Sequence, residues 1–429
     1  MKALVYERNV ARYVAARAVS AWGSGRGAGI GPLRLLESDP PALPAPDWVR
    51  VSPTLSGICG SDLATIDGRS SRYFEDLVSF PFVPGHEVVG TLESGRRVVL
   101  QPVLGCAARA IEPPCPSCAE GRTGDCERVA FGHLAPGLQT GYCADTGGGW
   151  SEAGLVAHHA QLHPVPDDLS DADAVMVEPT SCAAHAVATS GLDEGDDVAV
   201  VGAGTLGLCV TASLDALAAA GAAPRAGSVV VGARYAHQRR WAEDLGASAA
   251  VPDGQLARAV RRKSRSLVIG GPQVGSRALS GGADLVFDCV GSADSIAASL
   301  AIVRPRGKVV LVGMPGRVHV DLAPLWHREV SLAGAYAYGT EHVGSWPAPV
   351  STFDLAFAVV RAHRLGRLVS ATYPIERYEE AIAHAGAAGR RGAVKVAFDL
   401  RREPRRGAAL TAAGAGGATT AATTTTGGT

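Results

Sequence analysis

The stretch Val198-Ala-Val-Val-Gly202-Ala-Gly204-Thr-Leu-Gly207 places a glycine-rich turn after an apolar strand and before an Ala- and Leu-rich segment typical of a helix. In this context the Gly-x-Gly-x-x-Gly spacing is typical of dinucleotide-binding domains. Gly202 permits the tight turn, Gly204 lets the backbone approach a pyrophosphate, and Gly207 allows close packing of helix on strand. The helix N-terminus adds unpaired N–H donors for phosphates. The stretch therefore predicts a Rossmann domain.

Strands and helices alternate after this turn. Apolar, β-branched segments lie at Ser228–Val231, Ala283–Phe287 and Val309–Val312, and Ser292–Val303 has the pattern of a helix. Such alternation indicates an α/β fold with a doubly wound parallel sheet.

The first 190 residues differ from this pattern. Short β-prone runs, for example Trp48–Pro53, Arg97–Val103 and Trp150–Ala157, are separated by Gly and Pro. They predict an irregular all-β unit with little helix. The chain returns to a strand at Ala393–Asp399.

Composition limits the function. The 429 residues carry a net charge of −1, so no basic field is present to bind nucleic acid. We find neither a signal peptide nor an uninterrupted apolar stretch that could span a bilayer, and we expect a cytoplasmic protein without membrane or nucleic-acid partners. Residues 407–429 contain only Gly, Ala and Thr apart from Leu410, which predicts a disordered tail.

Four of the nine cysteines fall in one short segment: Cys106, Cys115, Cys118 and Cys126. An odd number of cysteines in a chain without an export signal argues against a disulfide framework. Four clustered thiolates fit a closed, tetrahedral structural zinc site, whereas simple loop thiols are the alternative.

A second candidate metal site combines Gly57-Ile-Cys59-Gly-Ser61-Asp62 with Gly85-His86-Glu87. A cysteine and a histidine brought together by β-structure, with an acidic neighbour, suit an open zinc site. The segment that begins at Glu178 lies just before the Rossmann strand, where a further ligand could face a cleft between domains. Taken singly, Cys59 and His86 could instead be buried core side chains.

These motifs, in this order, resemble those of the zinc-dependent medium-chain alcohol/polyol dehydrogenases over nearly all of residues 1–400. The matching elements also include Val83-Pro-Gly-His-Glu87, Glu178-Pro179 and Asp288-Cys-Val-Gly291. The resemblance implies a GroES-like irregular β catalytic domain in two parts, 1–188 and 331–400. A Rossmann domain would span 189–330 and the tail 401–429. It also implies a homo-oligomer, either a dimer or a tetramer.

The same resemblance, to the sorbitol and sugar branch, makes Cys59, His86 and Glu178 ligands of a catalytic zinc ion. Glu87 would be an exchangeable or neighbouring ligand, and Ser61 would accept the proton of the substrate hydroxyl. The position where relatives often place a proton-relay histidine holds Ala64. Ser61 would then pass its proton to water or to the cofactor ribose. Cys106 departs from the family spacing, because eight residues rather than two separate it from Cys115.

The cofactor-binding residues expected from the Rossmann pattern and the resemblance are Gly202, Gly204, Thr205, Leu206, Gly207, Ala233, Arg234, Tyr235, Val290 and Gly313. An acidic residue at the end of the second strand binds the ribose 2′-hydroxyl of NAD. Alignment on Leu245-Gly-Ala247 puts Ala233 there, although an insertion at 221–227 blurs the register. Arg234 could pair with a 2′-phosphate, assisted by Tyr235 or Arg239. The sequence therefore favours NADP, with NAD as the alternative.

The resulting hypothesis is a zinc-dependent oxidoreductase that transfers a hydride between an alcohol, polyol or sugar hydroxyl and a nicotinamide cofactor. Two alternatives remain open from the sequence. One is a zinc-free quinone or enone reductase of the same superfold. The other is a non-catalytic, nucleotide-sensing protein, for which the missing relay histidine is the only argument.

Overall fold

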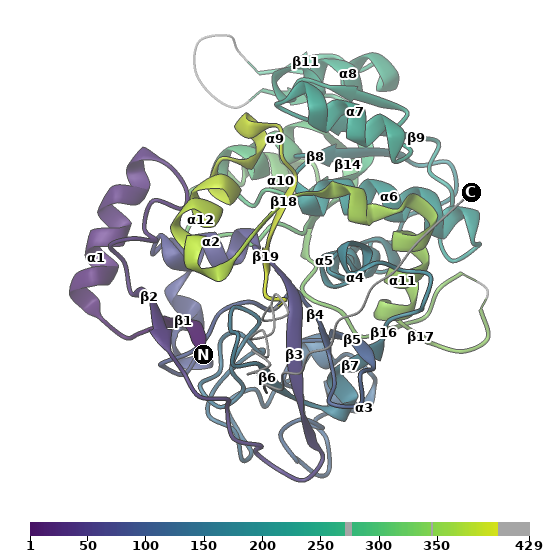
Figure 1. Cartoon of the computed structure of the whole chain (residues 1–429). Helices are drawn as coiled ribbons and strands as arrows, with labels where there is room; N and C mark the ends of the chain where they lie inside the picture. Colours follow the sequence, from purple (N-terminus) through teal and green to yellow (C-terminus); the bar gives the residue numbers. More distant parts are fainter. Residues whose placement is uncertain (271–276, 345, 402–429) are drawn as a thin grey trace, which may run out of the picture.

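The computed structural model describes residues 1–270, 277–344 and 346–401. The predicted disordered tail lies outside the described residues from position 402 onward. Figure 1 shows two packed parts, one around a parallel sheet and the other around a mainly antiparallel sheet.

The parallel sheet confirms the predicted doubly wound α/β fold. Its six strands lie in the order β10-β9-β8-β13-β14-β15, and every neighbouring pair is parallel. The strands span Asp197–Val201 (β8), Ser228–Gly232 (β9), Ala249–Val251 (β10), Ala283–Asp288 (β13), Val303–Leu311 (β14) and Ser331–Gly334 (β15). The helices between them are α6 (Thr205–Ala219), α7 (Ala236–Asp244), α8 (Leu256–Ser264), α9 (Ala293–Ile302) and α10 (Ala323–His327).

The glycine-rich turn lies at the carboxyl end of β8, where the strand order reverses toward β13. This switch point is where open α/β sheets bind ligands. Gly202 has a φ of 92°, which favours glycine, and Gly204 is the N-cap of α6. A Cβ on Gly207 would lie 1.8 Å from the Gly202 carbonyl oxygen, so the helix packs as closely as predicted.

The mainly antiparallel sheet has the order β18-β19-β3-β4-β5-β7, and β6 also pairs with β3. Its strands are β3 (Trp48–Gly57), β4 (Val88–Thr91), β5 (Arg97–Leu100), β6 (Leu155–His158), β7 (Leu162–Pro164), β18 (Val369–Tyr373) and β19 (Lys395–Asp399). β19 pairs with β3, so the end of the described chain rejoins its first part. Three two-stranded ribbons complete the strands of the described residues: β1 (Lys2–Tyr6) with β2 (Leu33–Glu37), β11 (Val268–Ile269) with β12 (Ala278–Leu279), and β16 (Thr340–Glu341) with β17 (Val350–Ser351).

The expectation of little helix in the first 190 residues is wrong. That part contains α1 (Val10–Val19), α2 (Gly60–Ile66), α3 (Pro116–Ala119), α4 (Asp171–Ala174) and α5 (Val177–Ala188). Asn9 caps α1, because its side chain accepts a hydrogen bond from the Arg12 N–H at 3.0 Å. α5 is almost wholly buried and contacts α6 and α11, so tertiary packing supports it.

The Rossmann sheet also continues past the boundary predicted at residue 330. β15 begins at Ser331 and pairs in parallel with β14, because the chain forms one further crossover through α10. The remaining helices are α11 (Thr352–His363) and α12 (Tyr378–Gly386). Among the described residues, no helix is long and apolar enough to cross a membrane.

Candidate active site and metal centres

The first metal-ligand group forms where β3 and β4 meet α2. Cys59 precedes α2, while His86 and Glu87 lie just before β4. One ligand atom from each of these three residues lies within 4.8 Å of the other two. Thiolate, imidazole and carboxylate are the donors that Zn²⁺ takes in proteins, so this set fits the ion.

Asp62 orients this group. Its Oδ1 lies 3.4 Å from His86 Nδ1, and its Oδ2 accepts the Cys59 N–H at 2.9 Å. A carboxylate on one ring nitrogen leaves the other for a metal, which is a common arrangement around metal-bound histidine. Burial lowers the pKa of His86, but the nearby charges of Asp62 and Cys59 outweigh burial and hold that pKa well above its usual value.

Glu87 has a buried partner of opposite charge. Its carboxylate forms an ion pair with Lys395 of β19. Burial opposes the charge on Lys395, but the Glu87 charge outweighs it and the pKa of Lys395 is raised. The paired lysine balances a carboxylate that would be costly to bury alone.

Glu178, the predicted third ligand, is buried on α5 but does not join the group of three. Its Oε1 accepts a long hydrogen bond of 3.8 Å from the Cys182 thiol. Burial, with a contribution from the Glu87 charge, raises the pKa of Glu178 to about 7. This carboxylate comes from α5, whereas the other donors lie in the segments just before α2 and β4, so its distance from them depends on how α5 packs.

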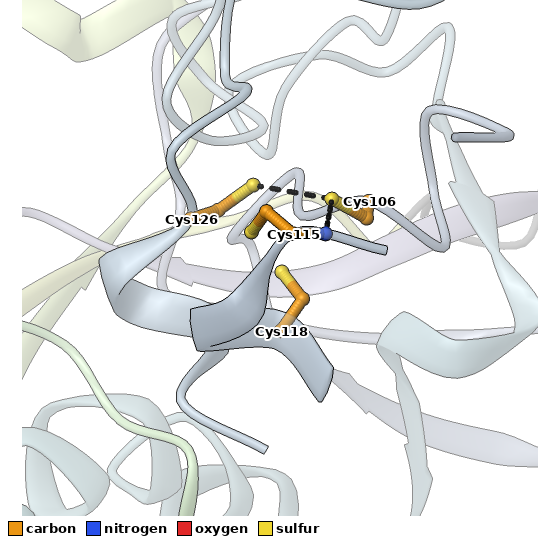
Figure 2. A group of neighbouring side chains, drawn as sticks. All are labelled: Cys106, Cys115, Cys118 and Cys126. Atoms are coloured by element: carbon orange, nitrogen blue, oxygen red, sulfur yellow. Dashed lines mark hydrogen bonds between the residues drawn. The ribbon is translucent and has the colours of Figure 1, made fainter. Parts of the chain in front are cut away.

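The second group consists of the four clustered cysteines. Figure 2 shows the side chains of Cys106, Cys115, Cys118 and Cys126 gathered with their sulfur atoms together. All four sulfur atoms lie within 4.8 Å of one another, and Cys106 Sγ is 3.8 Å from Cys126 Sγ. The unusual spacing therefore does not exclude Cys106 from the group.

Backbone N–H groups point at these sulfur atoms. Cys115 donates to Cys106 Sγ at 3.3 Å and Arg128 donates to Cys126 Sγ at 3.4 Å. Burial raises the pKa of the Cys115 thiol, but hydrogen bonds from neighbouring groups outweigh burial and bring it to about 7. Four sulfur donors with this support fit a closed Zn²⁺ site.

One cavity of about 1510 Å³ joins the first metal group to the Rossmann turn. It is lined by Cys59, Ser61, His86, Glu87 and Glu178 on one side, and by Gly204, Thr205, Leu206, Val290 and Gly313 on the other. A bound dinucleotide at the turn therefore reaches the same space as a substrate at the metal group.

Two family models match the chain. The alcohol dehydrogenase GroES-like domain matches residues 45–167, and the zinc-binding dehydrogenase model matches residues 187–353. The chain belongs to the zinc-dependent medium-chain alcohol/polyol dehydrogenases. It is a zinc-dependent oxidoreductase with a nicotinamide cofactor, as predicted.

Relatives of this dehydrogenase include the sorbitol dehydrogenase of Arabidopsis thaliana, 29% identical over 73% of this chain and 80% of that protein. The L-idonate 5-dehydrogenase of Vitis vinifera is 28% identical over 86% of this chain and 93% of its own length. Among solved structures, galactitol-1-phosphate dehydrogenase from Escherichia coli has the same fold, with a TM-score of 0.64, 21% identity, and coverage of 93% of this chain and all of that one.

The sequence did not assign a role to three residues around the metal group of the dehydrogenase, namely Asp62, Lys395 and Tyr142. The Tyr142 hydroxyl donates to Asp62 Oδ1 at 3.3 Å. Asp62 was visible within a motif but carried no assigned role. Lys395 had a usable signal, because a lysine within an apolar strand needs a buried partner. Tyr142 comes from an irregular segment and gave no signal.

After β9, where the cofactor ribose is expected to bind, the structure brings together only some of the predicted residues. Ala233 is buried at the end of β9, and Tyr235 lines the cavity. Arg234 is exposed and its Nε donates to Asp253 Oδ2 at 3.1 Å, a partner that was not foreseen. Arg239 donates to the carbonyl oxygens of residues 233 and 234.

Proposed function

We propose that this dehydrogenase interconverts an alcohol, polyol or sugar hydroxyl and the corresponding carbonyl, with NADP as the preferred cofactor. The observation that carries the proposal is the single cavity shared by the Cys59, His86 and Glu87 group and the Gly204 turn. The metal ligands would be Cys59 and His86, with Glu178 or Glu87 in the next position. The names of the sorbitol and idonate relatives support the substrate class.

The chemistry combines two bound groups with the protein's own proton path. Zinc, when held by these ligands, would supply a Lewis acid for the substrate hydroxyl, and a nicotinamide cofactor at the Gly204 turn would supply the hydride acceptor. Ser61 lines the cavity beside Cys59 and would accept the hydroxyl proton.

Other hydroxyl groups replace the absent relay histidine. Ser61 and Tyr142 line the same cavity, and the Tyr142 hydroxyl lies 3.4 Å from Thr65 Oγ1. Thr65 Oγ1 in turn lies 3.0 Å from Ser70 Oγ, and Ser70 lines the cavity. The proton would pass along these four hydroxyls and leave at Ser70.

The NADP preference is supported by charges from both parts of the molecule. No carboxylate stands at Ala233 to repel a 2′-phosphate, and Arg234 is adjacent. The segment of Gly389 packs on the other side, since a Cβ on Gly389 would lie 2.3 Å from Tyr235 Cε2. The next residue, Arg390, lines the cavity and forms no ion pair with any described residue. A 2′-phosphate would compete with Asp253 for Arg234 and could also meet Arg390.

Steady-state kinetics and direct binding test the proposal. We expect kcat/KM with NADP at least about 10-fold above that with NAD, and tighter binding of adenosine 2′,5′-bisphosphate than of 5′-AMP. Arg234→Ala and Arg390→Ala should each reduce both ratios, whereas Arg240→Ala, on an exposed position of α7 that does not line the cavity, should not. Preference for NAD would overturn the cofactor assignment. Absence of turnover with every alcohol, polyol and sugar tested would overturn the substrate class.

A further inference from the structure

Large apolar side chains stay exposed on the walls of the cavity that holds the metal group. On one wall, Val10 and Val14 are 74% and 60% exposed, and Tyr73 is 77% exposed. Met314 and Tyr336, also exposed, line the same cavity from the Rossmann part. Exposed apolar groups gathered around one hollow are typical of a binding surface.

Hydrogen bonds hold α1 in place beside the cavity. The Tyr13 hydroxyl donates to the Gly68 carbonyl at 3.0 Å, and Arg17 donates to the same oxygen at 3.2 Å. Gly68 follows α2, the helix that begins directly after Cys59, and Figure 1 shows α1 beside α2. Val10 and Val14 are four residues apart and therefore share one face of the helix. The contacts that fix α1 leave this apolar face free toward the cavity.

The charged groups near this face compensate one another. Arg8 lies 3.6 Å from Glu75, and Arg72 lies 2.9 Å from the same carboxylate. The Arg8–Glu75 pair joins the residues just before α1 to the segment Arg72–Leu77, which contributes Tyr73. A polyol bound here would turn hydroxyl groups toward valine and aromatic side chains, and hydroxyls that lose water without a new partner cost free energy.

We infer that the substrate carries an apolar body, aromatic or branched alkyl, beyond its reacting hydroxyl, and that the Val10/Val14 face of α1 binds it. This inference rests on the proposed function and narrows it from hydroxyl compounds in general to alcohols with an apolar substituent. The reacting carbinol would lie at the Cys59 and His86 end of the cavity, and the apolar body would extend toward α1.

The test compares four alcohols with the zinc-loaded full-length enzyme and NADP: sorbitol, 2-butanol, 1-phenylethanol and 1-(2-naphthyl)ethanol. We expect kcat/KM to rise at least about 10-fold from 2-butanol to the naphthyl alcohol, with sorbitol the poorest substrate. The double variant Val10→Asp/Val14→Asp should lose about 10-fold on the naphthyl alcohol and change less than about 2-fold on 2-butanol. Competitive inhibition by 2-acetonaphthone, measured with 2-butanol as substrate, should weaken in parallel.

The matched control is Ala11→Asp/Ala18→Asp, which adds the same charges to exposed positions of α1 that do not line the cavity. Its kinetics should match the wild type. The inference is overturned if sorbitol is the best substrate, if the Val10/Val14 variant loses activity equally on all alcohols, or if the control loses as much. If the enzyme is inactive on all four alcohols and on other hydroxyl compounds, the proposed function itself is contradicted. That outcome differs from activity with the wrong order of substrates, which contradicts only the inference.

Discussion

At the scale of single residues, the donor atoms of Cys59 and His86 determine the chemistry. Replacing either residue by alanine removes a ligand, and we expect kcat/KM to fall at least about 1000-fold, or ~4 kcal/mol. The melting temperature should change little, because the rest of the cavity wall is kept. Cys143→Ala is the control, since Cys143 is buried away from the cavity. Full activity of Cys59→Ala would contradict the assignment.

Thr65 tests the hydroxyl path at the same scale. Thr65→Val keeps the shape of the side chain but breaks the contacts with Ser70 and Tyr142. We expect kcat for alcohol oxidation to fall about 10-fold, with KM for the cofactor unchanged. Thr65→Ser, which retains the hydroxyl, should restore the rate and its pH profile. Equal activity of the valine variant would exclude the path.

At the scale of elements, the loops around the cysteine lobe are joined by Arg109, a fully buried cation. Its guanidinium donates to five backbone carbonyls, those of residues 104, 131, 134, 135 and 137. Arg109→Met leaves these carbonyls without a donor, so we expect a loss of about 3 kcal/mol or more in unfolding free energy. Arg122→Met, at an exposed position, is the comparison, and urea denaturation measures both. A similar small loss in both variants would disprove this role.

The cysteine lobe itself should hold the second of two zinc ions per chain. Cys118→Ala should reduce the zinc content of chelator-free protein from two to one and lower the melting temperature, because metal binding stabilises the fold only when all four sulfurs are present. Elemental analysis and thermal unfolding measure the two effects. One zinc or none in the wild-type protein would refute the assignment.

At the scale of the whole molecule, His163 of β7 joins the mainly antiparallel sheet to α11. The ring stacks on Phe353 at 4.3 Å between centroids, and Nε2 lies 2.8 Å from Gln101 Oε1. Burial lowers the pKa of His163, so below the unfolded-state value of about 6.5 the unfolded chain binds a proton that the folded protein does not.

Stability should therefore fall as the pH drops below about 6.5, and His163→Gln should reduce this dependence. Denaturant midpoints measured from pH 7.5 to 5.5 provide the test. An unchanged slope in the variant would show that His163 binds its proton equally in the folded and unfolded states and contributes nothing to the pH dependence of stability.

The sequence determined the features that depend on neighbouring residues. The apolar run before Gly202 and the spacing to Gly207 were sufficient for the Rossmann turn, because strand, turn and helix are local. The Cys59 and His86 motifs and the four cysteines likewise marked the metal groups, since zinc ligands require specific donor types at restricted spacings.

Only the tertiary structure decided which distant groups meet. Glu178 lies on α5, whose packing against the rest of the fold leaves it outside the group of Cys59, His86 and Glu87. Lys395 reaches Glu87 only because β19 returns to β3. α1 was not predicted from the sequence, and its contacts with Gly68 exist only in the folded chain. Ion pairs and apolar walls between remote segments depend on backbone geometry, which spacing along the chain does not encode.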